Sequence, residues 1–354
     1  MGYPRLEIAE SKIRLNCEYL TNFCSRQGIA IMGITKGVSA LLPVVKAMLR
    51  GGIEKLGDSR MKNIRALKEA EIGVPVYLIR IPMLSELEEV VYWSEGSFNS
   101  EVDVMQALAH KAKLYNKTHK VILLVDVGDL REGILPEDVS KTVGQILDFP
   151  ALELEGLGTN VGCYGGVLPS PENIRILFDL AQEIEKRYGI RLKTLSGGNT
   201  ATLSLLEKSN LGQGINQLRL GEAILLGTDA TNHRAVPGTS MDTMRLKAEV
   251  IEVKWKPSYP IGKIGRDAFG NIPVIEDRGE MRRAIVALGR QDCRIEGLTP
   301  VDQSMEIIGG SSDHLLLDVT RCADIGIGSL VEFKVTYAAM LSLSTSSYVE
   351  KAMV

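Results

Sequence analysis

The sequence predicts an α/β protein in which a (β/α)8 barrel is followed by a mainly β C-terminal domain. Short apolar runs alternate with amphipathic stretches from Ile29 to about Leu226, and eight strand–helix units within ~200–250 residues are what such a barrel requires. The pattern changes after Gly227, where Gly, Pro and Asp separate strand-like segments. A chain of 354 residues also favours two domains.

The barrel strands are predicted from short apolar runs and the helices from apolar residues repeating every three to four positions. A doubly wound open sheet is the alternative, although it usually needs fewer units. The expected strands are Ile29–Thr35, Ile53–Leu56, Val74–Ile79, Ser97–Asn99, Val121–Asp126, Leu152–Gly158, Leu192–Leu195 and Gln217–Leu220. The expected helices include Ala40–Arg50, Met61–Ala70, Ser85–Trp93, Glu101–Leu114 and Ile174–Arg187.

We expect the barrel to occupy residues 12–232 and the β-domain residues 233–354, joined by the N-terminal segment 1–11. Residues 233–241 are polar and contain Pro237 and Gly238, which is typical of a linker. The strands expected beyond it are Arg245–Lys254, Arg283–Leu288, Met305–Ile308, His314–Val319 and Leu330–Val335.

Composition excludes several classes of function. The net charge is −3 with 24% charged residues, which gives no basic surface for nucleic acid. No apolar run approaches membrane-spanning length, and the N-terminus lacks a secretory signal. Five scattered cysteines without a CxxC motif, and four histidines without paired spacing, argue against disulfides and a metal site. We therefore expect a cytoplasmic protein that binds no metal, membrane or nucleic acid.

Polar residues follow the ends of the predicted strands, where a barrel places its active site. Lys36 ends an apolar run and precedes Gly37, and burial there would lower its pKa and favour the neutral amine. Such an amine can attack an aldehyde such as that of pyridoxal phosphate. For Lys36 taken alone, a side chain that extends into solvent is the alternative. The strand ends of a barrel, however, meet at one opening, the barrel mouth, and a mouth lined by cationic side chains suits an anionic ligand. The other polar strand ends include Asp58, Arg80, Asn99, Asp126, Arg131, Asn160, Ser196 and Arg219.

Two turns could hold a phosphate group. Ser196-Gly197-Gly198-Asn199-Thr200 follows a predicted strand and precedes a helical pattern, and Gly221 and Glu222 follow the last strand. Glycine lets the backbone approach an anion, and a helix N-terminus offers free N–H groups. An ordinary helix cap is the alternative for the first turn. The Glu222 carboxylate would have to point away from a phosphate.

Together these motifs resemble the fold-type III pyridoxal-phosphate enzymes of the alanine racemase superfamily, and most closely its ornithine racemase branch. The resemblance runs nearly end to end and in the same order. It rests on Ile34-Thr35-Lys36-Gly37, Asp58-Ser59-Arg60, Leu78-Ile79-Arg80-Ile81-Pro82-Met83, Val125 to Gly133, Cys163-Tyr164-Gly165, Ser196-Gly197-Gly198-Asn199, Leu218-Arg219-Leu220-Gly221, Asp267 to Asn271 and Ser311-Ser312-Asp313-His314.

The resemblance implies a homodimer whose active sites use both chains, with pyridoxal 5′-phosphate as cofactor. It implies that Lys36 holds the cofactor as a Schiff base and also moves a proton. Arg219 would donate to the pyridine nitrogen and keep it unprotonated, and Arg131 would contact the phenolic oxygen. Asn160 replaces a histidine near the ring. The remaining implied cofactor ligands are Ser196, Asn199, Thr200, Gly221 and Glu222.

Three positions depart from alanine racemase. Ala40 stands in the region of a tyrosine, Leu124 replaces an often carbamylated lysine, and Phe269 replaces the tyrosine that is the second catalytic base. Phenylalanine cannot carry a proton, so Asp267 is our first candidate for that base or for an anchor of a substrate ammonium group, and Asp313 is the second. His314, Tyr164 and Cys163 rank behind them. These residues could instead have structural roles: Asp267 could stabilise a turn, Asp313 could cap the end of a strand, and Cys163 could pack as a small apolar residue.

The resulting hypothesis is a racemase that interconverts L- and D-ornithine by two-base transfer of the α-proton, through an external aldimine. Alanine, lysine, serine or arginine remain open as substrates. A distal ammonium group needs a carboxylate, for which Asp267 and Asp103 are candidates. Two alternatives are a non-catalytic pyridoxal-phosphate homeostasis protein, which would consist of the barrel alone, and a metal-assisted aldolase, which would need His314 with Cys293 or Cys322.

Overall fold

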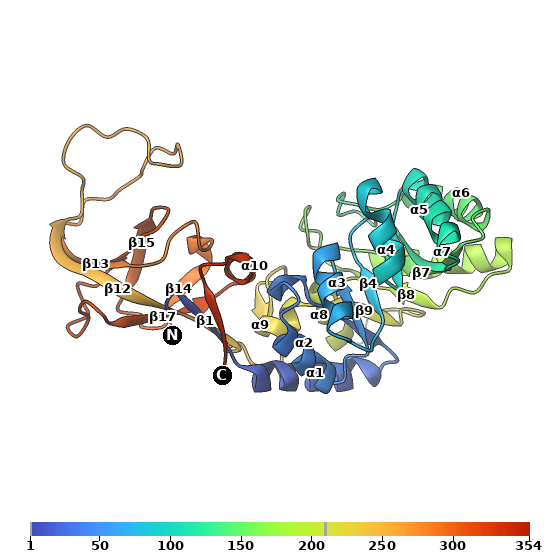
Figure 1. The fold of residues 1–354 in the computed structure, drawn as a ribbon, viewed down its shortest axis with the longest axis horizontal. Helices are drawn as coiled ribbons and strands as arrows, with labels where there is room; N and C mark the ends of the chain where they lie inside the picture. The colour runs from blue at the N-terminus through green and yellow to red at the C-terminus, as the bar shows by residue number, and fades with distance from the viewer. Residues whose placement is uncertain (1, 209–210) are drawn as a thin grey trace. The chain divides into compact units, whose positions relative to one another are not determined.

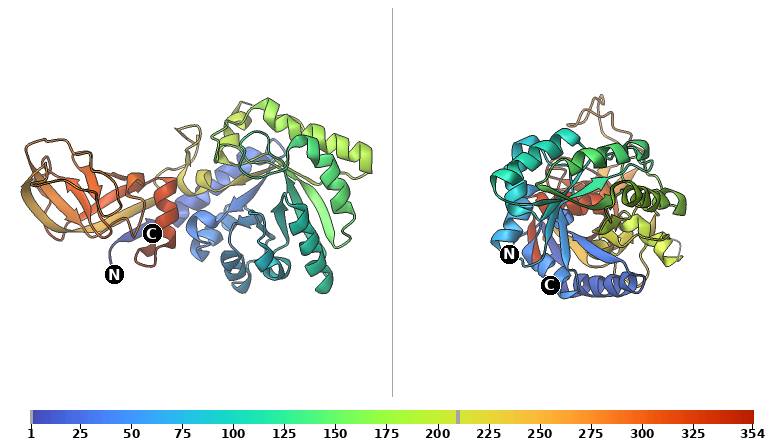
Figure 2. Two further views of the ribbon diagram at one scale, coloured as in Figure 1. Left: turned by 90° about the horizontal axis from the view of Figure 1, so that it is seen from above. Right: turned by 90° about the vertical axis from the view of Figure 1, so that its right-hand side faces the viewer.

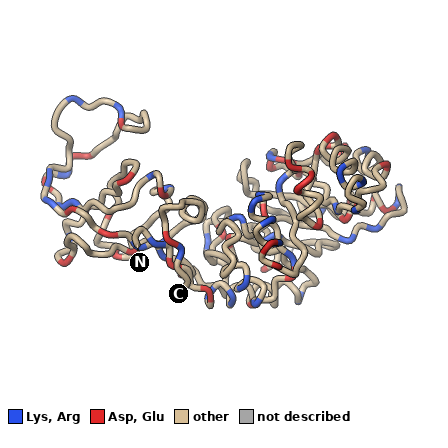
Figure 3. The backbone as a smooth tube through the Cα atoms, viewed as in Figure 1, with Lys and Arg blue, Asp and Glu red and all other residues tan. Residues whose placement is uncertain are grey.

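The computed structural model describes residues 2–208 and 211–354, which form two compact units (Figure 1). One unit runs from Glu10 to Met241, and the other combines the segment up to Ala9 with Asp242–Val354. Lys and Arg are interspersed with Asp and Glu along both (Figure 3). No helix in the described ranges is both long and apolar enough to cross a membrane.

The first unit is a closed barrel of eight parallel strands in chain order, with β9 pairing back to β2. This confirms the predicted fold class, and every predicted barrel strand overlaps an observed one. The strands are short because each spans only the barrel wall before the chain turns outward into a helix. They are β2 (Ala30–Ile34), β3 (Lys55–Asp58), β4 (Val76–Leu78), β5 (Gly96–Asn99), β6 (His119–Leu124), β7 (Leu152–Gly158), β8 (Thr194–Ser196) and β9 (Gln217–Leu220).

Helices surround the strands (Figure 2, right). Local signals explain several helix starts: α6 and α7 carry proline at the start and acidic residues in the first turn, and the Ser170 side chain caps α7. The helices of this unit are α1 (Glu10–Ser25), α2 (Leu42–Arg50), α3 (Met61–Glu69), α4 (Leu87–Trp93), α5 (Val102–Leu114), α6 (Pro136–Leu147), α7 (Pro171–Tyr188), α8 (Leu203–Glu207) and α9 (Glu222–Leu226).

A buried apolar cluster fills the barrel. It contains Met32, Ile34, Tyr77, Phe98, Ile122 and Leu124. Leu124, which the resemblance predicts to replace an often carbamylated lysine, is thus a core residue. Because this packing plugs the barrel, polar side chains are restricted to its two ends.

The second unit is a mainly antiparallel sheet in the order β14-β17-β12-β13-β16-β15, with β1 added antiparallel to β12 and β18 parallel to β1. It contains one α-helix among the described residues, α10 (Tyr337–Thr345). The sheet strands are β1 (Arg5–Ile8), β12 (Met244–Pro257), β13 (Glu280–Val286), β14 (Leu298–Pro300), β15 (Glu306–Gly310), β16 (Leu315–Asp318), β17 (Leu330–Val335) and β18 (Glu350–Met353).

The units divide after Met241, nine residues beyond the boundary expected at 232, and α1 begins at Glu10 rather than after residue 11. Residues 233–241 remain with the barrel because they are held there. The short strand β11 (Arg234–Ala235) pairs with β10 (Thr228–Asp229), and the Asn16 side chain of α1 bonds the backbone N–H and C=O of Ser240. Polar composition alone does not reveal such contacts.

Candidate active site

Lys36 begins a short 3₁₀ turn directly after β2, at the carboxyl end of the barrel. Its side chain is partly buried. Burial lowers the pKa of its ammonium group below the ordinary value, and the charges of Arg131 and Arg219 lower it further, whereas Cys163 acts in the opposite direction. A larger fraction of the neutral amine, the form that attacks an aldehyde or accepts a proton, follows from these surroundings.

The turn that carries Lys36 is anchored to the neighbouring strand by Asp58. This buried carboxylate accepts hydrogen bonds from Thr35 Oγ1 (2.6 Å), the Arg60 N–H (2.9 Å) and Asn63 Nδ2 (3.0 Å). Burial raises the pKa of Asp58, although these hydrogen bonds oppose the change. Because Thr35 precedes Lys36 directly, the bond to Asp58 fixes where the lysine leaves the strand.

Arg219 is a buried cation held by neutral groups. From β9 its Nη1 donates to Ser196 Oγ (2.7 Å) and its Nη2 to the Thr159 carbonyl (2.6 Å), and its Cζ lies 5.0 Å from the centre of the Phe98 ring. No described carboxylate forms an ion pair with it, and burial lowers its pKa to about 10. The guanidinium remains charged at neutral pH and places a fixed positive charge at the barrel mouth.

Arg131 lies in the loop that follows β6 and differs from Arg219 in its partner. Its Nε and Nη2 bind both carboxylate oxygens of Glu132. Burial lowers the pKa of Arg131, but the hydrogen bond and charge of Glu132 outweigh this effect and raise it. Its charge is therefore partly neutralised, whereas that of Arg219 is not.

Asn160, two residues after β7, lies within hydrogen-bond distance of both arginines and can accept from either one. With Oδ1 toward Arg219, its amide accepts from Arg219 Nη2 (3.3 Å) and Asn199 Nδ2 (2.9 Å). With the amide flipped, Oδ1 accepts from Arg131 instead. A small amide at this position thus orients a guanidinium group.

A buried carboxylate, Asp129, ties together two loops of the mouth. It accepts from the backbone N–H groups of Tyr164 (2.9 Å), Val167 (3.2 Å) and Cys163 (3.4 Å). These hydrogen bonds lower the pKa of Asp129 against the effect of burial, which raises it. The loop of Arg131 and the loop of Cys163 are consequently held as one piece. The Cys163 thiol lies 3.2 Å from Asn160 Nδ2.

The two predicted phosphate turns meet beside Arg219. The backbone N–H groups of Gly198, Asn199, Thr200, Gly221 and Glu222 donate to no acceptor among the described residues. Gly198 has φ +113°, and a Cβ there would lie 2.5 Å from Thr202 Oγ1. Free N–H groups around glycine are the usual protein binding site for a phosphate. We call the two turns that carry these five N–H groups the phosphate cradle.

Side chains at the cradle have separate roles. The Asn199 side chain caps the following turn by accepting from the Ala201 N–H (2.9 Å), as the capping alternative expected. Thr200 Oγ1 joins the two turns by accepting from the Ala223 N–H (3.3 Å). The Glu222 carboxylate accepts from Thr228 Oγ1 (2.7 Å) and the Ala230 N–H (3.0 Å), and burial raises its pKa. Glu222 therefore offers the cradle its backbone and not its carboxylate.

Asp267 lies in the second unit, in the long loop between β12 and β13, at an exposed tight turn. It accepts from the N–H groups of Asn271 (2.8 Å) and Phe269 (2.9 Å), and the hydrogen bonds from Asn271 lower its pKa. These contacts fit the structural alternative for Asp267. They also keep the carboxylate ionised and make it a weak proton acceptor.

Asp313 lies at the exposed turn between β15 and β16 and accepts from Ser312 Oγ (2.6 Å). The Arg290 N–H bonds the Ser311 carbonyl in this turn (2.9 Å), and Arg290 Cζ lies 5.3 Å from the centre of the Phe269 ring. Arg290 therefore connects the turn of Asp313 with the loop of Asp267. Sequence reasoning missed this arginine, because only the folded sheet brings those loops together.

The structure thus gathers nine of the candidate residues at the barrel mouth and places two in the second unit. Sequence reasoning gave no role to three groups that position them: Glu132 beside Arg131, Phe98 beneath Arg219 and the clamp Asp129. Only Glu132 had a usable signal, as an acid adjacent to a candidate arginine. The nine residues at the mouth are Lys36, Arg131, Asn160, Ser196, Asn199, Thr200, Arg219, Gly221 and Glu222.

Comparisons with known proteins agree with this geometry. Residues 8–229 match the family "Alanine racemase, N-terminal domain". The lysine racemase of Thermotoga maritima is 42% identical over 99% of this chain and 98% of its own length. The ornithine racemase of Acetoanaerobium sticklandii is 39% identical over 99% of both chains.

Solved structures show the same fold. An alanine racemase of Clostridium difficile 630 superposes with a TM-score of 0.78 at 17% identity, covering 100% of this chain and 96% of its own. A D-threonine aldolase of Filomicrobium marinum reaches 0.73 at 14% identity, covering 97% and 88%. The fold therefore serves several reactions, and the relatives with about 40% identity are racemases. The resemblance is confirmed: the chain belongs to the alanine racemase family and is an amino-acid racemase of fold type III.

Proposed function

We propose that this racemase interconverts the enantiomers of ornithine with pyridoxal 5′-phosphate held at the barrel mouth. The observation that carries the proposal is the arrangement around Arg219, where one buried guanidinium, not ion-paired with any described carboxylate, adjoins both the cradle and the Lys36 amine. The five unpaired N–H groups suit a phosphate, and Lys36 suits an aldehyde.

The chain's own residues perform the proton transfer. When bound, pyridoxal phosphate withdraws electrons from the α-carbon of the attached amino acid and so acidifies its α-proton. Lys36, with its lowered pKa, accepts or returns that proton at Nζ on one face of the substrate. Arg219 presents a donor that does not surrender its proton, which limits electron withdrawal and favours racemisation over side reactions. Asn160 and Glu132 orient Arg131 beside it.

A distal ammonium group is the feature that distinguishes ornithine and lysine from alanine. We assign its recognition to Asp267, because hydrogen bonds from the Asn271 and Phe269 backbone keep that carboxylate ionised. An ionised carboxylate binds an ammonium group well but accepts a proton poorly. Lysine is the second candidate substrate, supported by the 42% identical lysine racemase.

We also infer a homodimer in which each barrel mouth is completed by the partner's second unit. The loop between β12 and β13 supports this, because it exposes several large apolar side chains, among them Ile261 (93% exposed) and Val274 (99%). Exposed apolar patches usually mark surfaces that another chain covers. Ile272 and Phe269 extend the same surface around Asp267.

A racemisation screen tests this function. The purified protein, supplied with pyridoxal phosphate, is incubated with each enantiomer of ornithine, lysine and alanine, and the products are separated by chiral chromatography. We expect ornithine to give the highest kcat/KM in both directions, lysine a lower one and alanine the lowest. Activity restricted to alanine would contradict the assigned substrate. Conversion of ornithine without added or copurified cofactor would contradict the cofactor.

A further inference from the structure

Every amino-acid substrate carries an α-carboxylate, and the groups described above leave this carboxylate without a partner. Lys36 suits the aldehyde and the α-proton, the phosphate cradle suits the phosphate, and Asp267 suits the distal ammonium group. Carboxylates are bound best by a guanidinium group that offers paired N–H donors. The arginines of the chain are therefore the first candidates.

Both guanidinium groups of the barrel mouth already donate to acceptors of their own chain. Arg219 uses Nη1 for Ser196 Oγ (2.7 Å) and Nη2 for the Thr159 carbonyl (2.6 Å). Arg131 gives its Nε and Nη2 to the two carboxylate oxygens of Glu132. Glu132 also places a negative charge beside Arg131, which repels a second carboxylate. The α-carboxylate therefore needs a cation from another part of the molecule.

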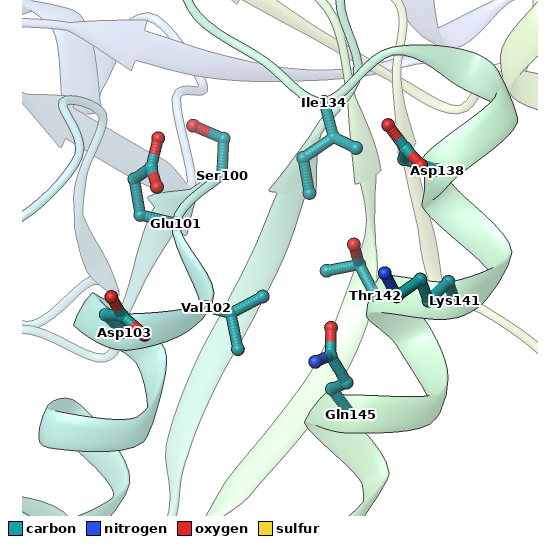
Figure 4. A pocket seen from close by; sticks show the side chains of 9 residues that line it. All are labelled: Ser100, Glu101, Val102, Asp103, Ile134, Asp138, Lys141, Thr142 and Gln145. Carbon is teal, nitrogen blue, oxygen red and sulfur yellow. The ribbon is translucent and has the colours of Figure 1, made fainter.

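The groove between the starts of α5 and α6 offers a lysine but no suitable site for an anion (Figure 4). Lys141 lies on one wall together with Asp138, and Glu101 and Asp103 lie on the other wall. Such carboxylates are ordinary at helix starts, because they complement the helix dipole. They also repel an incoming carboxylate, so this groove does not supply the missing cation.

Arg290, in the segment between β13 and β14 of the second unit, has a donor group to spare. Its backbone N–H donates to the Ser311 carbonyl (2.9 Å) and its Nε to the Gly310 carbonyl (3.3 Å). Its Nη1 donates to Glu296 Oε1 (2.5 Å), whereas its Nη2 donates to no acceptor among the described residues. The guanidinium is thus held at two nitrogens, and the third remains available to a ligand.

Phe269 connects Arg290 with Asp267. The Arg290 Cζ lies 5.3 Å from the centre of the Phe269 ring, and the Phe269 N–H donates to the Asp267 carboxylate (2.9 Å). Arg290 and Asp267 form no ion pair with each other, so neither charge neutralises the other. A cation and an anion beside one aromatic residue match the carboxylate and the distal ammonium group of a diamino acid.

We propose that Arg290 binds the α-carboxylate of the substrate in the barrel mouth of the partner chain. With the carboxylate on Arg290 and the distal ammonium group on Asp267, only the α-amino group of ornithine is left to reach the aldehyde. Arg290 thereby determines which of the two amino groups reacts. The inference rests on the proposed function, because it needs the second unit to complete the partner's mouth. It does not depend on the amino acid chosen, since all amino acids share the α-carboxylate.

Inhibition of the complete enzyme by two fragments of ornithine tests the proposal. δ-Aminovalerate keeps the carboxylate and the distal ammonium group, whereas putrescine keeps both amino groups and has no carboxylate. Arg290→Gln should raise the inhibition constant of δ-aminovalerate and the KM of ornithine about 10- to 150-fold, the effect of one lost charge-assisted hydrogen bond. The kcat should change little, because this contact is made before and during the reaction alike. The inhibition constant of putrescine should stay within about 2-fold of wild type, since no carboxylate contact is lost.

Two further variants separate binding from a structural role. Arg290→Lys keeps the charge but loses the planar N–H pair, so its inhibition constant for δ-aminovalerate should lie between those of wild type and Arg290→Gln. Arg294→Gln is the matched control, because Arg294 is exposed in the same unit and only its backbone forms a described hydrogen bond. It should leave both inhibitors unaffected. Equal weakening of both inhibitors by Arg290→Gln, or of neither, would overturn the proposal.

Hybrid dimers show in which chain Arg290 acts. Mixing Arg290→Gln with Lys36→Ala should restore part of the activity at the wild-type KM, because one mouth then has both groups intact. No recovery, given demonstrated subunit exchange, would overturn binding in the partner's mouth. If lysine or alanine is racemised and ornithine is not, the inhibition is measured with that substrate. A selective loss of δ-aminovalerate inhibition would then leave Arg290 assigned while the proposed substrate fails.

Discussion

The barrel mouth and the loop between β12 and β13 both carry candidate site residues, yet they are built in opposite ways. At the mouth, hydrogen bonds join separate loops: Asp129 bonds the Tyr164 N–H, and Arg219 bonds the Thr159 carbonyl. In the long loop between β12 and β13, which Figure 1 shows extending from the sheet, the described hydrogen bonds of the Asp267 side chain stay within its own turn. The first region is cross-linked within one chain, while the second is held only by its own turn, as expected if, as we propose, a partner's barrel mouth packs against it.

The space around the glycines also differs between the barrel mouth and the long loop. At the mouth, a Cβ on Gly133 would lie 2.5 Å from the Asp126 backbone nitrogen, so packing requires glycine there. In the long loop, a Cβ on Gly262 or Gly265 would meet nothing within 4 Å. Close packing at Gly133 thus fixes one end of the Arg131 loop before any ligand binds, which is a form of the preorganisation that catalysis needs. Gly262 and Gly265 give the long loop no such packing constraint.

Lys36→Ala should have the largest effect, because it removes the amine at the centre of the rigid region. We expect racemisation to fall by about 10³-fold or more, since a positioned proton carrier alone contributes ~10²–10⁴-fold. Borohydride should also cease to fix pyridoxal phosphate on the chain, as mass spectrometry would show. Lys46→Ala on the exposed side of α2 is the control. Full activity in Lys36→Ala would disprove its role.

Arg219→Gln should separate function from stability. Removing the hydrogen-bonded charge costs about 1.5–3 kcal/mol per lost bond, but it also relieves the burial that lowers the pKa of Arg219 to about 10. These effects nearly cancel, so we expect the free energy of unfolding in urea to change by about 1 kcal/mol or less. Racemisation should fall ~10²–10³-fold. A large loss of stability would instead make Arg219 a structural residue.

Asp267→Asn tests whether the long loop completes a partner's site. Loss of a charge-assisted hydrogen bond worth ~1.5–3 kcal/mol should lower kcat/KM for ornithine about 10- to 150-fold and spare alanine. Mixing this variant with Lys36→Ala should restore part of the activity through hybrid dimers. Asp302→Asn, another exposed turn aspartate, is the control. Equal losses for ornithine and alanine would make Asp267 the second base.

The last prediction concerns stability rather than activity, at the barrel wall below the mouth. Buried His119 bonds Ser97 Oγ (2.8 Å), and burial lowers its pKa to about 4. The unfolded chain, with a histidine pKa of about 6.5, binds one more proton between these values. The free energy of unfolding should therefore decrease as pH falls from 6.5 to 4, by about 1.4 kcal/mol per pH unit. His119→Gln should remove this slope in urea titrations; an unchanged slope would contradict it.

Strand ends were the most predictable part of the site. The places of Lys36 and Arg219 at strand ends could be predicted because apolar runs stop near them, and such runs reveal where a barrel strand ends. Their partners could not be identified. Thr35 bonds Asp58 across 23 positions, and Asp129 bonds Tyr164 across 35, and no local pattern marks such pairs.

The expected domain boundary at residue 232 differs from the observed division after Met241 for a related reason. Pro237 and Gly238 mark a turn, and we interpreted the turn as a linker. Hydrogen bonds between Asn16 and Ser240 hold this segment on α1 instead. Composition describes how a segment bends, but contacts with a distant helix decide to which unit it belongs.

By itself, the sequence determined the succession of strands and helices, the residues at the strand ends and the family resemblance, because apolar periodicity and motif order are local properties. Only the tertiary structure decided the ionic surroundings of each group. Closing the barrel buries Arg219 beside Ser196 and Thr159 and brings the Asp129 carboxylate to the Tyr164 N–H. Burial and long-range hydrogen bonds set charge and pKa, and both arise only when distant segments meet.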